Sequence, residues 1–66
     1  MARVTVRMLP GGETRTVEAE RVSDLIRSLG LDDESYVILR DGKPLLPGDR
    51  LRDGETIVVV RVLSGG

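Results

Sequence analysis

Apolar and polar residues alternate at the start of the chain. In ARVTVRML (residues 2–9), Val4, Val6 and Met8 fall on one side of an extended strand, and the polar residues between them fall on the other. Pro-Gly-Gly at 10–12 favours a turn, because proline fixes φ and glycine accepts positive φ. The stretch ETRTVE (13–18) then returns with β-favouring Thr and Val. This part of the chain therefore predicts a β-hairpin.

A helical period replaces the alternation in VSDLIRSLGL (22–31). Its apolar residues form one stripe on a helix: Val22, Leu25, Ile26 and Leu29. Ser23 is the best helix cap by its chemistry, although the stripe allows a start one or two residues earlier, and Asp24 suits the positive end of the helix dipole. Gly30 followed by Leu31 predicts a Schellman-type end. So short a helix is not stable alone in water, so it must pack on a sheet.

The remaining residues predict three further strands or strand pieces. YVILR (36–40) reads as a strand with apolar residues on both faces, and DGKP (41–44) is a turn by its Asp-Gly pair. Leu45 and Leu46 form a short piece after this turn. TIVVVRVL (56–63) is the strongest strand, because it is β-branched almost throughout. Its apolar residues fall on both faces, which indicates a central strand.

The element order β-β-α-β-β-β predicts an α+β fold, with a mixed sheet of four to five strands packed on one short helix. A hairpin, a helix crossing one face, and a final central strand beside the first make the β-grasp arrangement. The first and last strands can pair in parallel because enough chain lies between them. The same elements also fit a small open α+β sandwich in another strand order. We interpret residues 1–63 as one domain and residues 64–66 as a flexible tail.

Composition narrows the possible functions. The 66 residues contain neither Cys nor His, which removes the usual nucleophile, the usual general base and the commonest zinc ligands. We therefore expect no metal site and no catalysis by the chain itself. Ten basic and 11 acidic residues give a net charge of -1, and Tyr36 is the only aromatic residue, so nucleic-acid binding is not expected. The apolar runs are too short to span a bilayer and no signal peptide leads the chain, which predicts a soluble cytoplasmic protein with no membrane partner.

Four stretches together resemble the ubiquitin-like sulfur carriers and modifiers, which include the thiamine and molybdenum-cofactor sulfur carriers (ThiS/MoaD) and the archaeal small modifier proteins. The stretches are VTVRML, VSDLIRSLGL, DGKPL and VLSGG. They cover nearly the whole chain in the family's order. Each stretch is common by itself, but the set with a diglycine end is specific. The resemblance implies a β-grasp fold and a chain that is a substrate of enzymes and carries no catalysis of its own.

The resemblance also implies what happens at the diglycine. A ubiquitin-activating-type enzyme, using ATP and Mg²⁺, adenylates the carboxylate of Gly66. The acyl-adenylate is converted to a thiocarboxylate for thiamine, molybdenum-cofactor or tRNA thiolation enzymes, or is joined to target-protein lysines by isopeptide bonds. The residues suit this chemistry, because glycine places no side chain beside the carbonyl, and Ser64, Gly65 and Gly66 form a thin tether. A frayed end with incidental glycines is the alternative.

The last strand offers a candidate docking surface for the activating enzyme. If Ile57 and Val59 point at the helix, alternation places one apolar set on the opposite sheet face: Val58, Val60 and Val62. Leu39 joins this set if Ile38 points inward. Its position two residues before the Asp-Gly turn resembles that of the isoleucine in the hydrophobic patch of ubiquitin. The alternative is that these residues have no docking role. β-branched residues favour strands in general, and scattered exposed apolar groups are normal on protein surfaces.

Two questions stay open at this point. Lys43 is the only lysine, so self-linked chains would form there or at the N-terminus, although a solvated turn lysine is the plainer interpretation. The tail favours neither sulfur transfer nor conjugation: VLSGG lacks the basic residues that precede the glycines of ubiquitin, and the small Ser64 is similar to prokaryotic carrier tails. A non-covalent ubiquitin-fold protein-binding module is the alternative outside these two roles.

Overall fold

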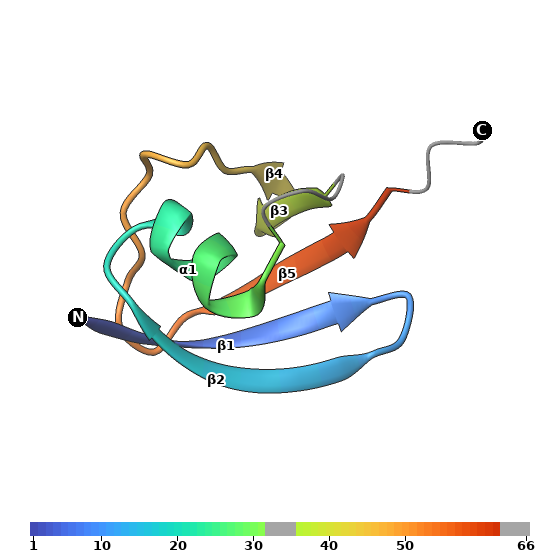
Figure 1. Ribbon diagram of the computed structural model, residues 1–66, viewed down its shortest axis with the longest axis horizontal. Coiled ribbons are helices and arrows are strands. Elements are labelled where there is room, and N and C mark those ends of the chain that lie inside the picture. Colours follow the sequence, from blue (N-terminus) through green and yellow to red (C-terminus); the bar gives the residue numbers. More distant parts are fainter. Residues whose placement is uncertain (32–35, 63–66) are drawn as a thin grey trace.

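The computed structural model of the chain describes residues 1–31 and 36–62 as one mixed sheet with a helix across one face (Figure 1). The elements are β1 (Ala2–Leu9), β2 (Glu13–Ala19), α1 (Val22–Leu29), β3 (Tyr36–Arg40), β4 (Lys43–Pro44) and β5 (Thr56–Arg61). The strand order is β2-β1-β5-β3-β4. β5 pairs in parallel with β1 and antiparallel with β3, so the last strand is central. The β-grasp order is therefore confirmed, and the open sandwich with another strand order is not formed.

The core lies between the sheet and the helix, as the two periodicities predict. Four strand residues of the inner face are fully buried: Val4, Val6, Ile57 and Val59. Val22 and Leu25 of α1 pack against them with no exposed surface, and Leu51 closes the same cluster from the segment before β5. Burying side chains of this size stabilises a protein by about 1.5–3 kcal/mol each. The burial of these residues is therefore a large favourable term in the folding of this small domain.

The N-terminus of the helix is held differently from the prediction. The helix begins at Val22 with Arg21 at the N-cap position, two residues before Ser23, as the apolar stripe allows. Ser23 lies inside the first turn, so the prediction that it caps the helix is wrong. The N–H groups of Val22 and Ser23 donate to carbonyls of segment 47–49, at 3.0 and 2.9 Å. The Asp24 carboxylate accepts from the N–H of Arg21 at 3.1 Å. Backbone from the segment between β4 and β5, which passes beside the helix in Figure 1, replaces the serine cap.

The C-terminus of the helix ends as predicted. Gly30 has a φ of 70°, the left-handed conformation that favours glycine. The N–H of Leu31 donates to the carbonyl of Ile26 at 3.0 Å, and that of Gly30 donates to Arg27 at 3.2 Å. These two bonds define a Schellman motif, and Leu31 is buried beneath it.

The turn after β3 is also as predicted, but the short strand that follows begins earlier. Asp41 and Gly42 both have positive φ, 50° and 78°, as a two-residue hairpin turn of type I′ requires. Such a tight turn pairs Lys43 with Arg40 at once, so β4 is Lys43–Pro44 and the expected piece at 45–46 is not a strand. The side chain of Leu46 is 70% exposed.

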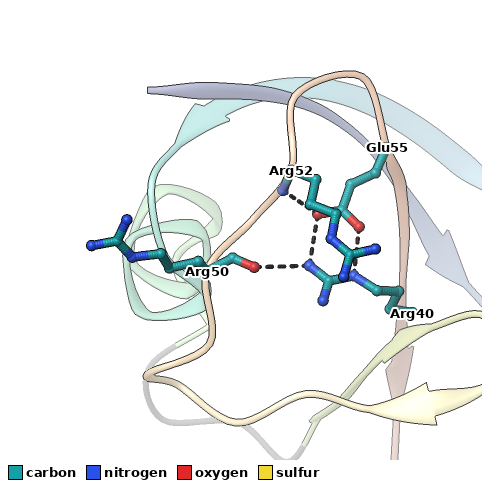
Figure 2. A network of polar contacts seen from close by, with 4 residues as sticks. All are labelled: Arg40, Arg50, Arg52 and Glu55. Carbon is teal, nitrogen blue, oxygen red and sulfur yellow. Dashed lines mark hydrogen bonds and ion pairs between the residues drawn. The ribbon is translucent and has the colours of Figure 1, made fainter.

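A polar network holds the segment before β5 against β3 (Figure 2). Arg40 donates from Nε and Nη2 to the two carboxylate oxygens of Glu55, at 2.6 and 2.8 Å. Nη2 of Arg40 also donates to the carbonyl of Arg50 at 2.8 Å, and the N–H of Arg52 donates to the Glu55 carboxylate. The Arg40 hydrogen bonds lower the pKa of Glu55, more than its partial burial raises it. The network joins the two segments by charge-assisted bonds.

Candidate docking face

Alternation along β5 separates its side chains as predicted. Ile57 and Val59 are fully buried under the helix, so the alternate residues Val58 and Val60 point to the outer face of the sheet and are partly exposed. Ile38 is 6% exposed and points inward, so Leu39 points outward. Leu39 lies directly opposite Val58 in the antiparallel β3–β5 pair. The structure therefore brings three of the four predicted docking residues onto one surface.

Two further apolar residues lie on this surface and were missed by the sequence analysis. Val37 lies opposite Val60 on β3, and Leu9 lies beside Val60 in the parallel β1–β5 pair. The alternation in YVILR places Val37 on the face of Leu39, which was a usable signal. The position of Leu9 depends on the register between β1 and β5, which the sequence does not reveal. We call these five residues the apolar outer patch: Leu9, Val37, Leu39, Val58 and Val60.

Three predicted site features lie outside the patch. Val62 follows the last residue of β5 and is 45% exposed. Lys43 is exposed on β4 at the edge of the sheet, opposite Arg40. The tail, Ser64 to Gly66, lies outside the described residues.

The rest of the outer face is polar. Rows of register partners run across β2, β1 and β5, and one row consists of Thr16, Thr5 and Thr56. The next row runs from Thr14 through Arg7 to Val58, where the apolar outer patch begins. One sheet surface thus has an apolar part, mainly over β5 and β3 with Leu9 of β1, and a hydroxyl-rich part, mainly over β1 and β2 with Thr56 of β5.

A hollow of about 510 Å³ lies near the end of the helix, on the inner side of the sheet. Its lining includes Met8, Glu13, Leu29, Tyr36 and Arg61. The guanidinium carbon of Arg61 lies 5.9 Å from the centroid of the Tyr36 ring, a cation–π distance. No short stretch of the sequence indicates this hollow, because it forms where residues distant in sequence meet.

Two other findings concern metals and membranes. Among residues 1–31 and 36–62, no group of three or more His, Cys, Asp or Glu side chains could hold a metal ion. In the same part of the chain, no helix has the length and apolar character needed to cross a membrane.

The arrangement of these elements defines the class of protein. Caldiarchaeum subterraneum ubiquitin superposes with a TM-score of 0.74 over 98% of this chain and 98% of that one, at 14% identity. A solved structure described as "Molecular Mimicry of SUMO promotes DNA repair" gives a TM-score of 0.64 at 20% identity, covering 94% of this chain and 90% of that one. Likeness at these identities shows the fold alone. The chain is a ubiquitin-like β-grasp protein.

The family follows from the sequence. Residues 2–63 match the model of the family Small archaeal modifier protein 2, and the chain belongs to this family. An "Uncharacterized protein" of Archaeoglobus fulgidus is 40% identical over 50 residues, which are 76% of this chain and 73% of that protein. The predicted resemblance is confirmed. Ubiquitin-like modifiers generally depend on an activating enzyme and on target proteins, and are generally not enzymes themselves.

Proposed function

We propose that the chain is a protein modifier and sulfur carrier whose reactive group is the carboxylate of Gly66. Three observations support the proposal: the family match over residues 2–63, the Gly65-Gly66 at the end of the sequence, and the apolar outer patch. The patch carries the most weight, because it is centred on β5, the strand that leads in sequence to the diglycine. The activating enzyme grips the patch and receives the tail.

In this reaction the chain contributes only its terminal carboxylate, and the enzymes supply the other reacting groups. An oxygen of the Gly66 carboxylate attacks the α-phosphorus of ATP, and pyrophosphate leaves with Mg²⁺ held by the enzyme. Sulfide or a lysine amine then attacks the carbonyl of the acyl-adenylate, AMP leaves, and the attacking group loses a proton. The product is a thiocarboxylate in the first case and an isopeptide in the second. Glycine at this position leaves both faces of the carbonyl open to attack.

The patch is well placed to hold the domain during these steps. β5 is hydrogen-bonded on both sides, so its outward side chains form a fixed surface. Gly66 is six positions after Val60, and extended chain spans at most about 20 Å over six steps. The activating enzyme must therefore hold the apolar outer patch within about 20 Å of its adenylation site.

Replacing Val60 with Asp tests the docking role. A carboxylate in the middle of an apolar interface is desolvated without a partner, so we expect the KM for the chain in adenylation to rise by about tenfold or more. Leu46→Asp is the matched control, because Leu46 is apolar and exposed but lies outside the patch; we expect a change within about twofold. The measurement is ATP–pyrophosphate exchange with the activating enzyme of the same organism. Equal kinetics in the two variants would contradict the docking assignment.

A second experiment tests the fate of the carboxylate. The chain is incubated with ATP, Mg²⁺, the activating enzyme and a sulfur source, and its intact mass is measured. One sulfur-for-oxygen exchange supports the carrier, and conjugates that disappear when Gly65 and Gly66 are deleted support the modifier. Lys43→Arg shows whether self-linked chains use the only lysine. An unchanged mass with every enzyme supports a non-covalent binding module instead.

A further inference from the structure

The charged side chains on the outer face of the sheet are few. Among the strand residues, those that point outward are Arg3 and Arg7 on β1 and Glu18 on β2. Arg3 and Glu18 are direct register partners and form an ion pair at 3.1 Å. Within the described ranges, Arg7 forms no ion pair and no side-chain hydrogen bond. Among the described residues, Arg7 is thus the outward charge that has no ionic partner.

Arg7 lies at the boundary between the two halves of the face. Its register partners are Thr14 on β2 and Val58 on β5, and its outward neighbours along β1 are Thr5 and Leu9. None of these four positions carries a carboxylate. Neighbouring strands are about 4.8 Å apart, so the Arg7 backbone lies about one strand spacing from an apolar patch residue. The aliphatic stem of an arginine extends such a surface while its guanidinium stays in water.

We propose that Arg7 receives a carboxylate of the activating enzyme and determines which enzyme docks on the apolar outer patch. This proposal rests on the proposed function. A partner that fits the face presents apolar side chains to Val58 and Val60. It also carries an Asp or Glu about 5 Å to the β1 side, in reach of the guanidinium. A bidentate guanidinium–carboxylate pair fixes the orientation of the partner, and therefore the direction from which the tail enters the enzyme.

The surroundings of Arg7 favour a protein carboxylate over a phosphate backbone. Nucleic acids are bound by stripes of several cations, often interleaved with aromatic side chains. Here a single unpaired arginine borders an apolar patch, and Arg3, the other outward cation of the described strands, already holds Glu18. An apolar patch with one charge at its border is typical of protein interfaces, where such charges steer association and exclude wrong partners.

Arg7→Met tests the proposal, because methionine keeps the apolar stem and removes the charge. The matched control is Arg15→Met on β2, where Arg15 is also exposed but points to the inner side of the sheet as the register partner of Val6. Binding to the activating enzyme of the same organism is measured by calorimetry at about 50 mM and about 500 mM salt. We expect Arg7→Met to raise Kd about tenfold at low salt, with a smaller difference at high salt. Arg15→Met should change Kd within about twofold.

Kinetics and stability separate this role from a structural one. In ATP–pyrophosphate exchange, Arg7→Met should raise KM and leave kcat unchanged, because the charge aids docking and not chemistry. Arg7→Lys should recover part of the loss, since an ammonium restores the charge but not the bidentate geometry. Thermal unfolding midpoints of the Met variants should match the wild-type midpoint, because both arginines are exposed.

The outcomes distinguish this proposal from the function on which it rests. If Arg7→Met behaves like Arg15→Met while Val60→Asp weakens binding, the docking function stands and the role of Arg7 is wrong. If Arg7→Met weakens binding equally at both salt concentrations, the contact is not ionic and the proposal also fails. If neither Arg7→Met nor Val60→Asp weakens binding, the outer face is not the docking surface, and both proposals are wrong.

Discussion

The two faces of the sheet are built from neighbouring residues yet have different physical roles. Val59 is fully buried beneath the helix, while Val60 is partly exposed on the other side. The inner face is covered by α1 and by the segment that carries Leu51. No described element covers the outer face, although it also carries apolar side chains. The comparison shows that one strand can stabilise the domain with every second residue and leave the residues between partly exposed to solvent.

The difference between the faces is important because a chain of this size has few apolar residues with which to form its core. A domain of about 60 residues buries only about 60% of the surface that its unfolded chain exposes, and its stability is a small difference between large terms. Leaving five apolar residues on the outer face lowers the area buried on folding. An apolar patch that is kept at this cost supports the proposed docking surface.

The largest expected difference between the faces comes from the same substitution at adjacent positions. Val59→Asp places a carboxylate in the core without a partner, and we expect a cost above about 4 kcal/mol and loss of cooperative unfolding. Val60→Asp should cost only about 1 kcal/mol, mainly through lower β propensity. Urea unfolding followed by circular dichroism measures both variants. Equal destabilisation would show that the outer face is as closely packed as the inner one.

An intermediate effect is expected at the Arg40–Glu55 network, which is the polar part of the inner side. Glu55→Gln removes the charge from these hydrogen bonds, and we expect a loss of about 1–2 kcal/mol at neutral pH. The Arg40 hydrogen bonds lower the pKa of folded Glu55. Its contribution is therefore complete above the unfolded pKa, about 4.3, and is lost as the pH falls through the lower folded value.

This pH dependence has a direct check. The free energy of unfolding of the wild-type chain should fall by a larger amount than that of Glu55→Gln when the pH is lowered from about 6 to about 3. The two stabilities should therefore converge in acid. Parallel curves for the two proteins would mean that the charge of Glu55 does not stabilise the fold.

The smallest effect on stability is expected in the β3–β4 turn, at the edge of the sheet. Gly42 has a φ of 78° and its added Cβ would meet nothing within 4 Å, so Gly42→Ala costs only backbone strain, about 1 kcal/mol. Gly48→Ala is the control, because Gly48 is equally open but its φ is not in the left-handed region. Thermal unfolding should show a lower midpoint for Gly42→Ala and an unchanged or slightly raised one for Gly48→Ala. Equal midpoints would argue against a strained turn.

Some features of the fold could be read from short stretches because their causes are local. Alternation in β1 and β5 follows from the two-residue period of a strand, and it separated Val58 and Val60 from the buried residues. The Schellman end at Gly30 and the turn at Asp41-Gly42 follow from the few residues that adopt positive φ readily. The prediction of a Ser23 cap was wrong because the groups that replace it are distant in sequence. Carbonyls at 47–49 meet the helix N-terminus only after the chain has folded.

The sequence by itself determined the order of the elements apart from the position of β4, the two faces of the long strands β1 and β5 and, through the full set of motifs, the family. Only the tertiary structure decided which strands lie side by side and in which register. That register gathers Leu9, Val37 and Leu39 around the outward valines of β5, and it leaves Arg7 beside Val58 with no carboxylate among its register partners and outward neighbours. The physical reason is that side-chain periodicity is a property of a few consecutive residues. Strand register is settled by long-range packing and pairing across the whole sheet.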